Sequence, residues 1–214
     1  MKLLKFYDKK SVEPTDHDIV VVDEKYVFDK PKELILKESL TAFSGDDFTI
    51  KDTDGTSYFK CEGKTFNIRD KKVVYDLEGN PVFNVRNTIL FLKSRLKIYD
   101  GKDDKKTLAS VSPVTSISSR KYTITYTNIA TEKEETLDLK CDFFSHSCGV
   151  FYGKEKEGSP MICKVIKKID AKSLLTNKEN YYIEIASGVD VAFMVAIAIC
   201  FDELKNDDKD HKIK

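Results

Sequence analysis

One stretch near the end of the chain limits the possible folds more than any other feature. Between Val189 and Phe201 every residue except Asp190 is apolar, so a helix formed there has no polar face. A helix that is apolar all round must lie in a protein core or in lipid. A membrane span needs about 20 apolar residues, whereas this run has about 13, or about 20 Å of helix. We therefore predict a buried core helix and no transmembrane span.

Small and large side chains are mixed along this run in a way that suits a crowded core. Alanines let surrounding strands approach closely, while the larger residues fill volume. The side chains expected to pack in the core are Val191, Phe193, Met194, Ala196, Ile197, Cys200 and Phe201. A short apolar helix in a chain otherwise made of strands predicts a barrel with the helix threaded through its centre.

The remainder of the chain has the pattern of many short strands. β-branched and aromatic runs alternate with polar residues and are separated by Gly, Asn and Asp turns. Two hairpins are expected, one pairing 47–51 with 56–61 and the other pairing 72–77 with 82–86. Further strands are expected at 19–22, 34–42, 65–69, 89–99, 107–111, 121–127, 134–140, 149–153, 161–168 and 182–186. Such regular recurrence is typical of a mainly β fold, either a sandwich or a closed barrel.

No linker, repeat or low-complexity segment divides the 214 residues. We expect one domain over residues 18–205, a loose N-terminal segment at 1–17 and a charged C-terminal tail at 206–214. The five cysteines are scattered and lack CxxC spacing, which favours reduced thiols and a cytoplasmic location. Lys plus Arg and Asp plus Glu both number 36, so only a local patch can attract a polyanion.

Three segments resemble motifs of the LURP-one-related (LOR) family, in the same order along the chain. Residues 45–63, GDDFTIKDTDGTSYFKCEG, and residues 71–101, KKVVYDLEGNPVFNVRNTILFLKSRLKIYDG, are similar to the first two motifs. Residues 181–204, YYIEIASGVDVAFMVAIAICFDEL, are similar to the C-terminal signature. The matching positions in that signature are Tyr182, Ile183, Ile185, Gly188, Asp190, Ala192, Phe193, Asp202 and Glu203. Family members often carry a Trp where this chain has Leu96.

This resemblance implies both a fold and a class of function. The implied fold is that of tubby C-terminal and phospholipid scramblase domains, a closed antiparallel barrel of about twelve strands around a hydrophobic C-terminal helix. The tubby-like relatives are phosphoinositide-binding, membrane-tethered regulators of transcription. The resemblance therefore implies an intracellular protein that is peripheral at a membrane or nuclear, although a shared fold does not by itself fix a function.

A row of cations in the segment TILFLKSRLKIY is the strongest candidate for a binding site. Alternate residues of a strand share a face, so Lys93, Arg95 and Lys97 form one outward row. Such a row can hold a phosphorylated headgroup or an anionic leaflet, at about 1 kcal/mol per cation. The apolar residues expected on the same face are Ile89, Phe91 and Tyr99. The alternative is an ordinary solvated strand face whose cations pair with neighbouring acids.

Other clusters fit a site less well. A calcium loop centred on Gly55 lacks oxygen ligands at its first and last positions, and residues 177–180 hold a single carboxylate. Cys141, His146 and Cys148 are one ligand short of a structural zinc site, and as a nucleophile pair His146 and Cys148 match no family signature. A second, weaker basic cluster consists of Lys164, Lys167 and Lys168.

We therefore predict a non-enzymatic, monomeric binding module of the LOR type, without cofactor or metal. Its expected partner is an anionic lipid headgroup or another protein, and nothing points directly to nucleic acid. A scramblase-like protein anchored by residues 189–201 is the first alternative, although the cysteine-rich and proline-rich segments of scramblases are missing. An enzyme with a site assembled from distant strands is the second; GxGxxG, P-loop and GxSxG motifs are absent.

Overall fold

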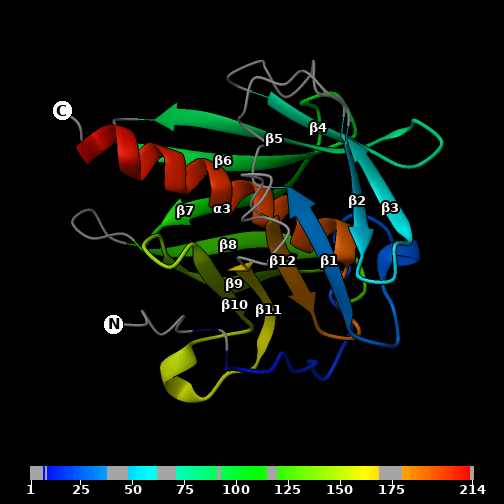
Figure 1. Ribbon diagram of the computed structural model, residues 1–214, viewed down its shortest axis with the longest axis horizontal. Coiled ribbons are helices and arrows are strands. Elements are labelled where there is room, and N and C mark those ends of the chain that lie inside the picture. Colours follow the sequence, from blue (N-terminus) through cyan, green and yellow to red (C-terminus); the bar gives the residue numbers. More distant parts are fainter. Residues whose placement is uncertain are drawn as a thin grey trace.

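Twelve antiparallel strands close into a barrel around one long helix in the computed structural model (Figure 1). The structure describes residues 7, 9–37, 48–61, 71–90, 93–114, 120–168 and 180–212. The strands are β1 (Lys32–Lys37), β2 (Phe48–Asp52), β3 (Ser57–Cys61), β4 (Lys71–Tyr75), β5 (Pro81–Leu90), β6 (Lys93–Asp100), β7 (Thr107–Pro113), β8 (Lys121–Asn128), β9 (Lys133–Asp142), β10 (Ser147–Phe151), β11 (Met161–Lys168) and β12 (Asn180–Ile185). The helices are η1 (Glu24–Tyr26), η2 (Glu155–Glu157) and α3 (Val191–Lys212). The predicted fold class, a mainly β closed barrel with a C-terminal helix, is confirmed.

The strand order is the simplest that a closed sheet allows. Each strand pairs with its neighbours in sequence, and β1 pairs with β12 to close the circle, from Lys32 opposite Ile185 to Lys37 opposite Asn180. Both predicted hairpins are present, as β2–β3 and β4–β5. Their turns contain glycines with φ of 90° and 92°, in the left-handed region that other residues adopt only at a cost.

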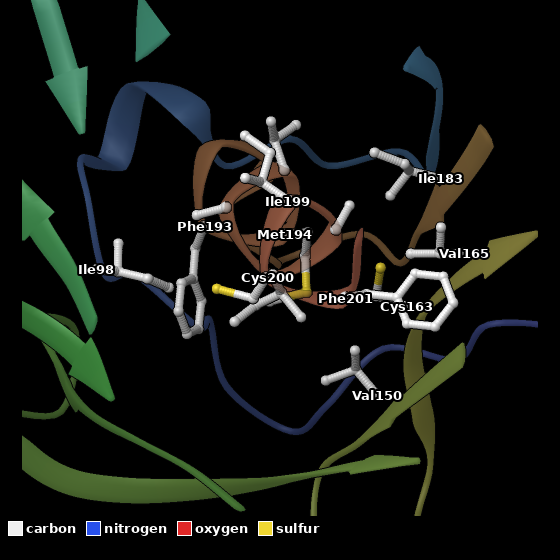
Figure 2. Close-up of a cluster of buried hydrophobic side chains, with 14 of the residues drawn as sticks. Ile98, Val150, Cys163, Val165, Ile183, Phe193, Met194, Ile199, Cys200 and Phe201 are labelled. Atoms are coloured by element: carbon white, nitrogen blue, oxygen red, sulfur yellow. The ribbon is translucent and has the colours of Figure 1, made fainter. Parts of the chain in front are cut away.

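The first part of α3 fills the barrel. Every residue from Val191 to Phe201 is at most 2% exposed, and the residues named above as core are among them. The ring of Phe193 lies 5.3 Å from that of Tyr126, and the ring of Phe201 stacks on Phe143 at 6.0 Å. Figure 2 shows side chains of the barrel wall gathered around those of the helix. The interior is therefore occupied by the chain itself, as the apolar run predicts.

Asp190 fixes the point at which α3 enters the barrel. Its side chain is buried, and its Oδ1 accepts the N–H of Phe193 at 3.0 Å, which caps the first turn of the helix. Its Oδ2 accepts three further N–H groups, from Val21 at 3.1 Å, Val22 at 2.6 Å and Asp23 at 3.3 Å. One carboxylate thus ties the N-terminal segment to the start of the helix.

The prediction of a strand at 19–22 is wrong, because side-chain acceptors take the backbone hydrogen bonds that a strand would form. Within this segment the structure has only an isolated bridge, between Ile19 and Val189. The N–H of Val20 donates to Oδ1 of Asn128, and the N–H groups of Val21 and Val22 donate to the Asp190 carboxylate, so they do not form a strand ladder. The apolar residues of the segment still enter the core, which explains their strand-like composition.

The single strand predicted at 89–99 is also wrong. β5 continues to Leu90, and β6 begins at Lys93 and runs back beside it, with Leu90 opposite Lys93. A tight hairpin therefore lies within a segment that contains no Gly, Pro, Asn or Asp. Without a turn residue, the alternation of apolar and polar residues conceals the reversal.

The described part of the N-terminal segment expected to be loose lies against the barrel. Tyr7 is buried, and its ring lies 6.1 Å from that of Phe151. The N–H of Glu13 donates to the carbonyl of Met161 at 2.9 Å. The N-terminal segment is therefore attached to β10 and β11, a contact between distant parts of the chain that composition alone does not predict.

The charged tail expected after residue 205 is helical as far as Lys212, because α3 continues beyond its apolar part. Polar residues of this second part pair at the mouth of the barrel. Oδ1 of the buried Asp202 lies 3.3 Å from Nζ of Lys205, and Glu203 pairs with Lys72 on β4. Within the described residues, no helix is long and apolar enough to cross a membrane.

Candidate functional site: a cationic face on strand β6

β6 alternates between the core and the outside, and its outer side carries the cations. Leu96 and Ile98 are fully buried, Arg95 is exposed and Lys97 is half-buried. Lys93 is the first residue of the strand, and its side chain lies outside the described part of the structure. The period of two along β6 thus places Arg95 and Lys97 on one outward face.

Of the three apolar residues expected beside these cations, only Tyr99 has a side chain that the structure describes. Ile89 belongs to the preceding strand β5, and Phe91 lies outside the described residues. Tyr99 is only 9% exposed, and the register of β6 against β7 shifts between Ile98 and Tyr99. The prediction that Tyr99 is available to a membrane is therefore wrong.

One hydroxyl-bearing residue lies beside each of the two described cations in the sheet. Arg95 pairs with Thr88 of β5, and Lys97 pairs with Arg86 on one side and Ser110 of β7 on the other. The hydroxyl of Thr88 donates to the carbonyl oxygen of Arg95 at 2.8 Å. The Thr88 proton is therefore already used, and the face combines positive charge with the hydroxyl of Ser110, a combination that suits phosphate oxygens.

Acidic residues near this face pair with other cations. Asp104 lies 2.6 Å from Nη1 of Arg86, and Asp100 lies 3.1 Å from Nζ of Lys106. Within the described part of the chain, neither cation of the β6 face has a salt-bridge partner. These carboxylates are therefore engaged elsewhere and do not pair with Arg95 or Lys97.

The second basic cluster is engaged inside the protein. Nζ of Lys164 lies 2.8 Å from Glu184 on β12 and 2.8 Å from the carbonyl oxygen of Lys10. Nζ of Lys167 lies 3.0 Å from Nδ1 of His146. Both lysines are buried, so neither is available to a ligand; the side chain of Lys168 lies outside the described residues.

The two cysteines of the cluster lie next to each other in the structure, but their thiols are not activated. Cys141 and Cys148 stand directly opposite each other on β9 and β10, and both are buried. Burial raises the pKa of both thiols, and a neutral thiol neither attacks a substrate nor binds zinc. Among the described residues, no group of three His, Cys, Asp or Glu side chains is arranged to hold a metal ion.

The loop considered for calcium is a hairpin turn. Oδ1 of Asp52 accepts the N–H groups of Asp54 at 3.1 Å and Thr56 at 2.8 Å, and its Oδ2 accepts the hydroxyl of Tyr58 at 3.2 Å. The carboxylate therefore serves the turn between β2 and β3. Residues 177–179, the other segment considered, lie outside the described part of the chain.

The structure also reveals a polar cluster that the sequence does not predict. His17 contacts Asp16 through Nδ1 at 2.7 Å and Glu135 on β9 through Nε2 at 3.4 Å. Four side chains within hydrogen-bond distance of the Glu135 carboxylate are His17, Tyr126, Asn128 and Thr131. His17 and Glu135 are 118 residues apart, so no local motif could have linked them.

The pKa shifts in this cluster follow from its contacts. Burial lowers the pKa of His17, but hydrogen bonds and charges from Asp16 and Glu135 outweigh it, so the pKa is raised. Burial raises the pKa of Glu135, but hydrogen bonds from its neighbours outweigh it, so that pKa is lowered. With its oxygens already occupied, Glu135 holds the N-terminal segment in place and is not poised as a catalytic base.

A family model places the chain among known proteins. The model described as LURP-one-related matches residues 32–202, from the start of β1 into α3. The chain belongs to the LURP-one-related family. It is 24% identical over 193 residues to Protein LURP-one-related 15 of Arabidopsis thaliana, covering 89% of this chain and 88% of that protein.

Relatives of this family member extend beyond plants. The protein YxjI of Bacillus subtilis is 26% identical over 181 residues, covering 85% of this chain and 98% of its own length. An X-ray structure of an Arabidopsis thaliana protein has a TM-score of 0.60 at 22% identity, covering 86% of this chain and 98% of that one. That likeness establishes a shared fold.

Proposed function

We propose that this LURP-one-related protein is a non-enzymatic binding module that recognises anionic lipid headgroups through the β6 face. The observation that carries the proposal is the pair of cations Arg95 and Lys97, which form no salt bridge within the described residues. Hydroxyls of Thr88 and Ser110 lie beside them in the sheet. Each cation contributes about 1 kcal/mol near an anionic surface, and the hydroxyl of Ser110 can add a hydrogen bond to a phosphate oxygen.

The filled interior supports binding on the outer wall. α3 occupies the barrel with residues that are at most 2% exposed, so a ligand finds its contacts outside. The names of the relatives described above denote no enzymatic activity. By analogy with tubby-like proteins, the chain acts as a membrane-tethered regulator that is cytoplasmic and peripheral.

Co-sedimentation with phosphatidylcholine vesicles that contain a phosphoinositide tests this function. We expect binding at low salt that weakens as ionic strength rises. The triple variant Lys93/Arg95/Lys97→Ala should bind about 100-fold more weakly, because three cations at about 1 kcal/mol each are removed. The triple variant Lys102/Lys105/Lys106→Ala is the matched control, since it removes the same charge from the β6–β7 turn at the other end of the barrel.

Three outcomes would contradict the proposal. Absence of binding at low salt would exclude lipid recognition and favour a protein partner. Unchanged binding of the β6 variant would place the lipid site elsewhere. Equal losses in the two triple variants would indicate general charge attraction. Exchange of labelled lipid between leaflets, which we do not expect, would instead support the scramblase-like alternative.

A further inference from the structure

The turn between β9 and β10 holds an aromatic side chain out into solvent. Phe144 is 71% exposed, the largest value among the exposed large hydrophobic residues that the structure describes. The preceding residue, Phe143, stacks on Phe201 in the core, so the turn directs one ring inward and the next outward. Oδ1 of Asp142 accepts the N–H groups of Phe144 at 3.1 Å and Ser145 at 3.3 Å. The outward ring is thus displayed by an ordered turn, and this large apolar side chain is not buried in the core.

Cations stand beside this ring. The guanidinium carbon of Arg120 lies 4.8 Å from the ring centroid of Phe144, and the carbonyl of Arg120 accepts the N–H of Cys141 at 2.8 Å. The next residue, Lys121, is exposed, and its carbonyl accepts the N–H of Val114 at 3.0 Å. Val114 is 53% exposed. We refer to Val114, Arg120, Lys121 and Phe144 as the barrel rim.

The barrel rim adjoins the β6 face. Lys97 pairs with Ser110 of β7, and Ser110 pairs with Thr125 of β8. Arg95 precedes Lys97 along β6 and therefore lies nearer to the end of the barrel where Lys121 begins β8. β7 ends on this side too, where the second half of α3 emerges (Figure 1). Cations on the wall and apolar tips on the rim thus face the same end of the molecule.

We propose that the barrel rim docks on an anionic bilayer, with Phe144 entering the boundary between headgroups and acyl chains. Arg120 and Lys121 contact lipid phosphates at the same time. This inference rests on the proposed function and adds an apolar contact to the headgroup contact of β6. Aromatic rings favour the membrane interface, and long cationic side chains keep their charge among headgroups while their stems lie in apolar surroundings.

The charge around the ring argues for this partner. Arg120 and Lys121 complement the negative charge of an anionic leaflet, whereas docking on a neutral apolar surface would require no cations. The opposite end of the barrel offers a contrast: Ile129 is 43% exposed in the turn after β8, and the exposed acids Glu132 and Glu134 follow it. The exposed Lys133 lies between these two acids, so the turn around Ile129 carries no excess of positive charge and Ile129 provides a matched control.

The chain has no Trp, which permits a direct test. Phe144→Trp places a single fluorophore on the rim, and Ile129→Trp places one at the far end. With phosphatidylcholine vesicles that contain phosphatidylserine and a phosphoinositide, we expect the emission of Phe144→Trp to shift to the blue and to be quenched by brominated acyl chains. The emission of Ile129→Trp should not change. Pure phosphatidylcholine should leave both unchanged.

Vesicle binding of alanine variants completes the test. Phe144→Ala should lower the partition coefficient about fivefold, whereas Ile129→Ala should not change it, and both exposed substitutions should leave thermal unfolding unaltered. If anionic vesicles bind through β6 but the Phe144→Trp emission stays unchanged, the rim proposal fails and the proposed function stands. Complete absence of vesicle binding overturns both. A blue shift without vesicles that grows with protein concentration would indicate self-association and overturn the rim proposal.

Discussion

Asp190 carries an unusual share of the contacts that join the two ends of the chain. Its carboxylate serves the first turn of α3 through Phe193 and the segment from Val21 to Asp23, up to 169 residues away. Hydrogen bonds to an ionised acceptor are the stronger kind, and a buried donor left without an acceptor costs about 1–3 kcal/mol. A change of this single side chain should therefore loosen both the entry of the helix and the N-terminal segment.

Asp190→Ala should lower the free energy of unfolding by about 3–5 kcal/mol, because it leaves several backbone N–H groups without an acceptor. Asp190→Asn should cost less, since the amide oxygen still accepts. Urea denaturation followed by circular dichroism measures both. Asp76→Ala is the control: this exposed carboxylate also accepts backbone N–H groups, from Glu78 and Asn80, and its loss should cost about 1 kcal/mol. Equal costs would show that burial of Asp190 adds nothing.

His17 should make stability depend on pH. Its pKa is raised above the ordinary 6.5, so its contribution is fully present below pH 6.5 and is lost as pH rises through the raised value. The pKa of Glu135 is lowered from 4.5, so its contribution is present above pH 4.5 and is lost as pH falls. The contact is therefore strongest between these two values.

His17→Gln should reduce the free energy of unfolding by about 1 kcal/mol or less between pH 4.5 and 6.5, and the difference should shrink above that window. Parallel urea titrations of the two proteins across this range measure it. A constant difference at every pH would mean that the ionised pair is not responsible.

Elements differ in how far their sequences predict them. The core helix follows from an apolar run without a polar face, and the two hairpins follow from turns that contain glycine. The β5–β6 turn is not predicted because residues 89–99 contain no Gly, Pro, Asn or Asp. The structure of segment 19–22 is not predicted because two of its backbone N–H groups donate to the carboxylate of Asp190, which is distant in sequence. The β6 face follows from a period of two within one strand. The contact of His17 with Glu135 and the placement of Phe144 depend on tertiary structure and leave no local pattern.

Overpacking tests the enclosure of α3. Ala196 is fully buried, so Ala196→Phe should force neighbouring side chains from their preferred rotamers and lower the free energy of unfolding by about 1–3 kcal/mol. Ala130→Phe, at an exposed position after β8, should change it by less than about 0.5 kcal/mol. Thermal unfolding by calorimetry compares the two. A stable, monomeric Ala196→Phe variant would contradict enclosure of the helix.

For the whole molecule, the barrel wall and the helix depend on each other. The wall directs apolar side chains inward from every strand, and α3 is what they pack against. Without the helix, the same wall would surround an empty or water-filled space lined by apolar groups. A chain that lacks α3 should collapse without a fixed core.

Two truncations examine this dependence. A chain that ends at Asp190 should bind the dye anilinonaphthalene sulfonate and unfold without a cooperative transition. A chain that ends at Lys205 keeps the buried part of α3 and should unfold cooperatively. Cooperative unfolding of the shorter chain would show that the wall folds alone.

The position of the core helix also bears on how the protein is made in the cell. α3 is the last element of the barrel to leave the ribosome, and at about 5–20 residues per second the 32–190 region is exposed for on the order of ten seconds beforehand. During that time twelve strands with apolar inner faces lack the segment that covers them. Non-local pairing of β1 with β12 adds to the delay. The barrel is therefore completed only once α3 has left the ribosome, and until then the exposed apolar faces of the strands favour aggregation.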